Sequence, residues 1–228
     1  MTALHQSSGT NAERAVTMRL RELRLVPVIV IEDSRSAPAL GRALIEGGLP
    51  CAEVTFRTKG AREALTRLAG ECPDILAGAG TVLTRGQAAE ARAAGARFIV
   101  APGFNPVVVD YCLEEGIPVF PGIATPSELE AALTRGLSVV KFFPAEPLGG
   151  LTYLKAISAP YGAVEFMPTG GITLENVTSY LGFPKVVACG GSWMAPSDWI
   201  TAGNFDGITA EVKRAVTAVQ QRNGASDK

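Results

Sequence analysis

Short apolar runs rich in β-branched and aromatic residues recur along the whole chain and alternate with stretches of helical periodicity. Runs of this length and composition are typical of strands buried on both faces. We predict eight strands: 26–31, 51–56, 75–77, 98–100, 117–120, 138–143, 164–166 and 186–189. The predicted helices between them include residues 37–45, 61–68, 87–94 and 126–133.

Two of the helix starts carry local signals of their own. Thr125-Pro126-Ser127-Glu128 has a cap residue, a first-turn proline and a glutamate at the capping-box position, and Asn105-Pro106 repeats the first two signals. Such residues satisfy the free N–H groups of a first helical turn, or lack one, so both segments are predicted to begin helices.

The alternation of strand and helix favours one fold class. Eight strand-then-helix units with uniformly apolar strands predict a closed (β/α)8 TIM barrel rather than an open doubly wound sheet. An extra N-terminal helix over 12–23 precedes the first strand and is expected to cover the bottom of the barrel. We expect one domain, 12–222, between disordered tails at 1–11 and 223–228. In such barrels function lies in the loops after the strands.

Composition narrows the possible partners. The 228 residues are 47% hydrophobic and 19% charged, and Lys plus Arg total 21 against 22 for Asp plus Glu, a net charge of -1. No global field therefore attracts nucleic acid or an anionic membrane. No apolar run approaches the roughly 18 residues of a membrane span, and the N-terminus lacks the pattern of a signal peptide. We expect a cytoplasmic protein that binds small molecules, with no nucleic-acid or membrane partner.

Cysteine and histidine usage excludes several kinds of chemistry. The four cysteines form no C-x-x-C pair and are predicted to be reduced thiols in or near the core. The one histidine, His5, lies in the predicted N-terminal tail. Catalytic triads, histidine zinc sites and histidine acid–base catalysis all need an ordered imidazole, so no metal site is expected. Lysine, carboxylates, hydroxyls and the backbone remain as candidate catalytic groups.

The strand at 138–143 contains a lysine, Lys141, within an apolar run. Side chains alternate along a strand, so Val139, Lys141 and Phe143 share one face, which we expect to point into the barrel. A lysine desolvated near the barrel mouth can supply a neutral amine nucleophile. The alternative is a structural lysine paired with a buried carboxylate.

Three polar residues share one face of the strand at 51–56 and its continuation: Glu53, Thr55 and Arg57. If that face is the inner one, Glu53 can carry protons near Lys141, and Arg57 can hold a carboxylate through a planar two-point contact. The alternative is an ion pair of Glu53 with Lys141 or Arg57 that only stabilises the barrel.

Glycine-rich turns follow the last two predicted strands, as Pro168-Thr169-Gly170-Gly171 and Gly190-Gly191-Ser192-Trp193. Glycines let backbone N–H groups approach an anion, and these two loops commonly hold phosphate in TIM barrels. We therefore predict a phosphate site there, against the alternative of ordinary tight turns. Segments 78–82 and 101–104 add small or rigid residues at the same mouth or are plain turns, and Glu146 is expected to make local hydrogen bonds.

Several motifs together resemble the bacterial KDPG/KHG aldolase family, whose members cleave 2-keto-3-deoxy-6-phosphogluconate and commonly also 4-hydroxy-2-oxoglutarate. The resemblance spans roughly Pro27 to Trp199. It is carried by Val26-Pro27-Val28-Ile29-Val30, Glu53-Val54-Thr55-Phe56-Arg57-Thr58, Gly78-Ala79-Gly80-Thr81-Val82, Pro121-Gly122-Ile123-Ala124-Thr125, Lys141-Phe142-Phe143-Pro144-Ala145-Glu146, Pro168-Thr169-Gly170-Gly171-Ile172 and Gly190-Gly191-Ser192-Trp193.

The resemblance implies a class I aldolase that needs no metal or cofactor, forms a homotrimer and releases pyruvate and glyceraldehyde 3-phosphate. It implies that Lys141 forms an imine with the substrate and that Glu53 relays protons. The implied substrate-binding residues are Arg57, Thr81, Pro102, Phe143, Thr169, Gly170, Gly171, Gly191 and Ser192. Among them, the threonine before the paired glycines is associated with the gluconate epimer of the substrate.

The sequence also departs from the family pattern. Phe56, Ala101 and the pair Pro147-Leu148 stand where the family often has Leu, Ser and Ala-Asn, and the last change affects any polar contact of that loop. Two rival hypotheses stay open at this point. A phosphate-binding isomerase or synthase would use Lys141 only electrostatically, and a sugar-phosphate sensor would bind without turnover.

Overall fold

The structure is a computed structural model that describes residues 11–226, with side chains as far as residue 221. Its strands are β1 (Leu25–Ile29), β2 (Cys51–Thr55), β3 (Leu76–Gly80), β4 (Ile99–Val100), β5 (Val119–Phe120), β6 (Gly122–Ile123), β7 (Val139–Phe142), β8 (Glu165–Pro168) and β9 (Cys189–Gly191). The helices are α1 (Asn11–Leu23), α2 (Ala37–Glu46), α3 (Ala61–Glu71), α4 (Arg85–Ala93), α5 (Pro106–Glu114), α6 (Pro126–Thr134), α7 (Gly150–Ser158), α8 (Val177–Leu181), α9 (Ser197–Thr201) and α10 (Phe205–Ser226), with 3-10 turns η1 (Ser34–Ser36) and η2 (Glu146–Leu148).

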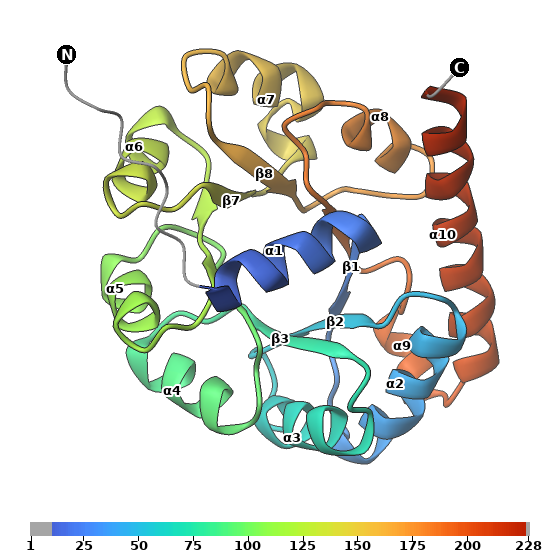
Figure 1. Ribbon diagram of the computed structural model, residues 1–228. Coiled ribbons are helices and arrows are strands. Elements are labelled where there is room, and N and C mark those ends of the chain that lie inside the picture. Colours follow the sequence, from blue (N-terminus) through green and yellow to red (C-terminus); the bar gives the residue numbers. More distant parts are fainter. Residues whose placement is uncertain (1–10, 227–228) are drawn as a thin grey trace.

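The strands pair in parallel and form a curled sheet system with helices on its outside (Figure 1). One sheet has the order β5-β4-β3-β2-β1-β9, and a second has the order β6-β7-β8. Parallel strands joined by helices on the outer face confirm the predicted α/β class. Single bridges, Phe166 with Val186 and Thr169 with Gly190, join β8 to the segment of β9.

The predicted fifth strand, 117–120, is shorter in the structure, and a strand that was not predicted follows it. β5 covers only Val119–Phe120, and β6 lies beyond Pro121 and pairs in the other sheet. Proline has no N–H to donate to a ladder, so regular pairing is interrupted there. The carbonyl of Pro121 still accepts a hydrogen bond of 2.9 Å from the Lys141 N–H.

Two layers of apolar side chains lie on the two faces of the strands. The larger packs the outer face against the surrounding helices. The inner layer joins side chains from the strands to Val16 and Leu20 of α1. The helix predicted over 12–23 is thus present as α1, and Figure 1 shows it lying across one end of the curled sheet. That end is filled, so the site must lie at the other.

Local signals place several helix ends. Thr125 and Glu128 form the predicted capping box of α6, and the Asn105 side chain accepts from the Val107 N–H at the start of α5. α4 begins two residues before the predicted 87, because the Thr84 side chain caps it. α10 continues to Ser226, so residues 223–226 are helical where a tail was expected. The rest of the predicted tails, 1–10 and 227–228, lies outside the described residues.

Candidate active site

Lys141 and Glu53 meet inside the curled sheet. Lys141 on β7 is 5% exposed and Glu53 on β2 is 2% exposed, and their Nζ and Oε1 atoms are 3.5 Å apart. Val139, two residues before the lysine, belongs to the inner apolar layer, as the alternation of strand side chains predicted. Two strands that are not neighbours in the sheets therefore bring an amine and a carboxylate together in a dry environment.

The Glu53 carboxylate has hydrogen-bonding capacity left over. Its buried Oε1 atom has no hydrogen-bond partner among the described residues, and 3.5 Å from Nζ is longer than the usual 2.7–2.9 Å of a charge-assisted bond. The backbone of Gly80 on β3 makes room for it, since a Cβ there would lie 2.2 Å from Oε1. An orphaned buried oxygen beside an amine is suited to act on a bound molecule.

Arg57 and Thr81 lie together at the ends of neighbouring strands. The Arg57 Nε donates to Thr81 Oγ1 at 3.1 Å. Thr81 has a positive φ of 55°, a sparsely populated conformation for a threonine that is typical of functional sites. Thr55, on the same face of β2, instead donates its hydroxyl to the Ile29 carbonyl at 2.8 Å and supports the sheet. The remaining N–H groups of Arg57 are thus available for a carboxylate.

Phe143 joins the lysine to the glycine turn after β8. The Lys141 Nζ lies 5.0 Å from the centroid of the Phe143 ring, a cation–π distance. The same ring covers Gly170, where a Cβ would lie 3.2 Å from ring atoms. Any side chain at position 170 would therefore press on the aromatic ring that covers the lysine.

A cavity of about 530 Å³ opens above these groups. Among the predicted site residues, it is lined by Arg57, Phe143, Thr169, Gly170, Gly171, Gly191 and Ser192. Lys141, Glu53, Thr81 and Pro102 are not in its lining. The first two are buried below it, and Thr81 reaches it through Arg57. The Pro102 carbonyl lies against Gly122 of β6, where a Cβ would come within 2.1 Å of it.

The two turns after β8 and β9 show why their glycines are needed. Gly170 and Gly171 have positive φ values of 96° and 81°, which side-chain-bearing residues rarely adopt. The ring of Trp193 lies against Gly191, where a Cβ would come within 1.7 Å of it. Backbone at the cavity wall is thus left without side chains, as expected for an anion site.

The sequence reasoning missed half of the cavity wall. The missed residues are Val28, Val30, Ile172, Trp193, Ala195, Pro196, Ser197 and Asp198. For Val28 and Val30 a signal existed, because they share a strand face with Val26 of the inner layer. Trp193 both borders the core and lines the cavity. Nothing in the sequence marks Ser197 and Asp198, which reach the wall through the loop after β9.

The thiols lie apart from this cavity. All four cysteines are free and buried. Burial raises the pKa of the Cys112 thiol to about 12, and it raises the pKa of Cys51 and Cys189 further. Such thiols stay protonated and unreactive at neutral pH. Among the described residues, no group of three His, Cys, Asp or Glu side chains is arranged to hold a metal ion, and no helix could cross a membrane.

The arrangement defines a class of enzyme before any comparison is made. A buried lysine beside a carboxylate, under a cavity with an arginine at one side and glycine turns at another, is suited to imine chemistry on an anionic carbonyl compound. The chain matches the family KDPG and KHG aldolase over residues 16–211 and belongs to that family.

Individual relatives agree over nearly their whole lengths. The chain is 55% identical over 191 residues to the 2-dehydro-3-deoxy-phosphogluconate aldolase of Treponema pallidum, covering 84% of this chain and 91% of the relative. It is 43% identical to the KHG/KDPG aldolase of Escherichia coli, covering 84% and 90%. A crystal structure of KDPG aldolase from Legionella pneumophila, with pyruvate captured as a covalent carbinolamine intermediate, is 41% identical with a TM-score of 0.84, covering 87% and 97%.

Proposed function

We propose that this protein is a class I aldolase, a carbon–carbon lyase that cleaves 2-keto-3-deoxy-6-phosphogluconate to pyruvate and glyceraldehyde 3-phosphate. The observation that carries the proposal is the buried Lys141 Nζ lying 3.5 Å from the Glu53 carboxylate. Relatives at 55% and 43% identity carry the names of this activity, and the Legionella pneumophila relative was captured with pyruvate bound covalently.

Lys141 is the nucleophile of the proposed reaction. Its neutral amine adds to the C2 ketone, and loss of water from the carbinolamine gives a protonated imine. Glu53 then accepts the proton of the C4 hydroxyl, the C3–C4 bond breaks, and its electron pair moves into the imine to give an enamine. The aldehyde leaves, a proton returns to C3, and water releases pyruvate and the free lysine.

The remaining residues bind the two charged ends of the substrate. Arg57 and Thr81 hold the carboxylate, because the guanidinium and the hydroxyl lie together at 3.1 Å beside the cavity. The phosphate is received by the two glycine turns, with Thr169, Gly170, Gly171, Gly191 and Ser192 as the binding residues. Phe143 covers the lysine, and Pro102 shapes the wall only indirectly.

We also infer that the strands close into a complete (β/α)8 barrel. Pro121 alone separates β5 from β6, so one extended segment takes part in both sheets. Bridges from Phe166 to Val186 and from Thr169 to Gly190 support closure on the other side.

Cleavage of 4-hydroxy-2-oxoglutarate is a second proposed activity, supported by the name of the Escherichia coli relative. A homotrimer and a cytoplasmic location stay predictions.

Reduction with borohydride in the presence of pyruvate tests the proposal, since it converts an imine to a stable secondary amine. Intact mass and peptide mapping should find one pyruvyl adduct, on Lys141. Release of pyruvate from the phosphorylated substrate should then follow in a coupled assay. An isomerase, a synthase or a sugar-phosphate sensor would give no adduct in folded protein, and that result would overturn the proposal.

A further inference from the structure

Glu146 forms a partly buried contact that the proposed reaction does not use. It lies in η2, the turn that follows β7 and Lys141, and its Oε1 accepts a hydrogen bond from the hydroxyl of Tyr180 on α8. Tyr180 is 2% exposed. Burial, then the hydrogen bond to Glu146, raises the pKa of the Tyr180 hydroxyl, so it stays a donor at all working pH values.

The same glutamate is packed against the glycine turn at the cavity. A Cβ on Gly171 would lie 2.6 Å from the Glu146 Cβ and 2.7 Å from its Cγ. The Glu146 N–H donates to the Gly170 carbonyl at 3.0 Å, and the Ala145 N–H donates to the Thr169 carbonyl at 2.8 Å. The turn after β7 is therefore fastened along the turn after β8.

These bonds also decide where the free N–H groups point. Glu146 holds the Gly170 carbonyl, and the Asn176 side chain holds the Gly171 carbonyl at 3.0 Å. In a trans peptide the carbonyl and the following N–H point to opposite sides. The N–H groups of Gly171 and Ile172 are thus turned away from these partners. They have no acceptor among the described residues, and both residues line the cavity.

We propose that Glu146 and Tyr180 are positioning residues that hold the 169–171 turn in its phosphate-binding shape and tie it to the strand of Lys141. This inference rests on the proposed function and names the residues that set the preference for a phosphorylated substrate. The hydroxyl of Tyr180 fixes the carboxylate, the carboxylate fixes η2, and η2 holds the carbonyl of Gly170. Neither residue lines the cavity.

The test compares a phosphorylated with an unphosphorylated substrate in Tyr180→Phe. Loss of a hydrogen bond to a carboxylate loosens the turn. We expect the KM for 2-keto-3-deoxy-6-phosphogluconate to rise about tenfold with little change in kcat, and both constants for 4-hydroxy-2-oxoglutarate to stay unchanged. Tyr161→Phe is the matched control, because it removes another tyrosine–glutamate bond, to Glu130 at 2.8 Å on the surface.

Two changes at Glu146 separate positioning from packing. Glu146→Leu keeps the Cβ and Cγ that touch Gly171 but removes the acceptor, so it should match Tyr180→Phe, and the double variant should be no worse than either alone. Glu146→Gln keeps an acceptor oxygen and should restore most of the affinity. The proposal would be overturned if the variants lost affinity equally for both substrates. It would also be overturned if the effects of Tyr180→Phe and Glu146→Leu added fully in the double variant. These variants also serve if Tyr180→Phe fails to fold.

Binding of inorganic phosphate makes the inference independent of turnover. In calorimetry, phosphate should bind the wild type and Tyr161→Phe equally, and Tyr180→Phe and Glu146→Leu more weakly by about the same tenfold. Unchanged phosphate affinity in the last two would overturn it. If the wild type bound phosphate but gave no pyruvyl adduct, the aldolase proposal would be overturned. The phosphate affinities of the variants would still test whether Glu146 and Tyr180 position the turn.

Discussion

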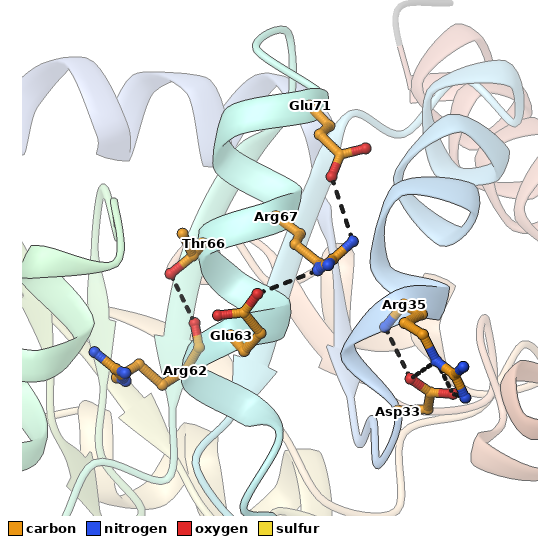
Figure 2. Close-up of polar contacts among 7 residues, drawn as sticks. All are labelled: Asp33, Arg35, Arg62, Glu63, Thr66, Arg67 and Glu71. Carbon is orange, nitrogen blue, oxygen red and sulfur yellow. Dashed lines mark hydrogen bonds and ion pairs between the residues drawn. The ribbon is translucent and has the colours of Figure 1, made fainter.

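Two ion pairs, one in the turn after β1 and one between side chains of β7 and β2, differ in geometry and in exposure to solvent. Asp33 and Arg35, in the turn after β1, meet at 2.7 Å through several hydrogen bonds and have side chains 48% and 82% exposed (Figure 2). Lys141 and Glu53 meet at only 3.5 Å, with side chains 6% and 3% exposed. The exposed pair thus has the shorter contact and the more complete hydrogen bonding.

The difference lies in what each pair leaves unsatisfied. Asp33 is held by the Arg35 side chain and by its backbone N–H, and in Figure 2 this pair stands beside a second exposed network on α3, centred on Arg67. Because solvent and salt screen exposed charges, such ion pairs contribute little to the free energy of folding. Around the buried pair, the low dielectric strengthens electrostatic interactions. The Glu53 Oε1 atom also lacks a hydrogen-bond partner among the described residues, so it can still accept one. The pair that we propose to be reactive is thus the buried one with the longer separation, and the exposed pair has the shorter, fully hydrogen-bonded contact.

The strongest way to break this comparison is to remove the buried amine. In Lys141→Met, cleavage and the borohydride adduct should both fall to background, because no imine can form. The protein should still fold, since methionine fills the lysine's volume with a similar unbranched chain. Pyruvate release and circular dichroism check the two statements. Turnover near that of the wild type would show that the reaction needs neither the amine nor the charge of Lys141.

Removing the buried carboxylate is expected to have the next largest effect. Glu53→Gln keeps the shape but cannot accept protons, so turnover should fall by roughly 10²–10⁴-fold. The borohydride adduct on Lys141 should still form, more slowly than in the wild type. Quench-flow trapping beside steady-state cleavage separates the two steps. An unslowed reaction would mean that another group or water carries the protons.

Displacing the carboxylate without removing it sharpens the comparison further. Gly80→Ala would place a Cβ 2.2 Å from Glu53 Oε1, so the carboxylate must shift. Misplacement by about 1 Å can cost up to about 10²-fold in rate, and we expect a loss of that order in kcat. Gly70→Ala on α3 is the control, because nothing lies within 4 Å of its Cβ. It should leave kcat unchanged, and a like loss in both would contradict the placement of Glu53.

The smallest effect is expected at the exposed pair. The Arg35 side chain, with its backbone N–H, lowers the pKa of Asp33 to about 2. A carboxyl with a lowered folded-state pKa stabilises the fold above its unfolded value, and this contribution is lost as the pH falls towards 2. In Arg35→Ala the carbon-detected NMR titration of Asp33 should move up towards 3.8, the ordinary value, while turnover stays unchanged. A marked loss of turnover in this variant would contradict the view that the exposed pair takes no part in the reaction.

The sequence predicted those features that depend on the pattern within a single strand or helix. Alternation alone put Lys141 on the same face as Val139, and Glu53 on the same face as Arg57, and the structure has both on the inner side. The capping residues of α5 and α6 were equally local signals. In each case the physical cause lies within a few residues of its effect.

Features that depend on distant segments could not be predicted in this way. The contact of Glu146 with Tyr180 joins residues 34 positions apart, and neither residue type is unusual in its own segment. Ser197 and Asp198 line the cavity because the first turn of α9, which follows β9 in the chain, lies at its wall. Pro121 is visible in the sequence, but the change of sheet between β5 and β6 depends on which strands lie beside them.

The helix α1 has a kinetic consequence. Val16 and Leu20 of α1 join the inner apolar layer and fill one end of the curled sheet, so we expect substrate and products to pass through the cavity at the other end. In the proposed reaction, pyruvate stays covalently attached to Lys141 after the C3–C4 bond breaks, while the phosphorylated aldehyde is free to leave. We therefore expect ordered product release, with the aldehyde first and pyruvate last. Inhibition by pyruvate should be competitive with substrate, and inhibition by the aldehyde noncompetitive.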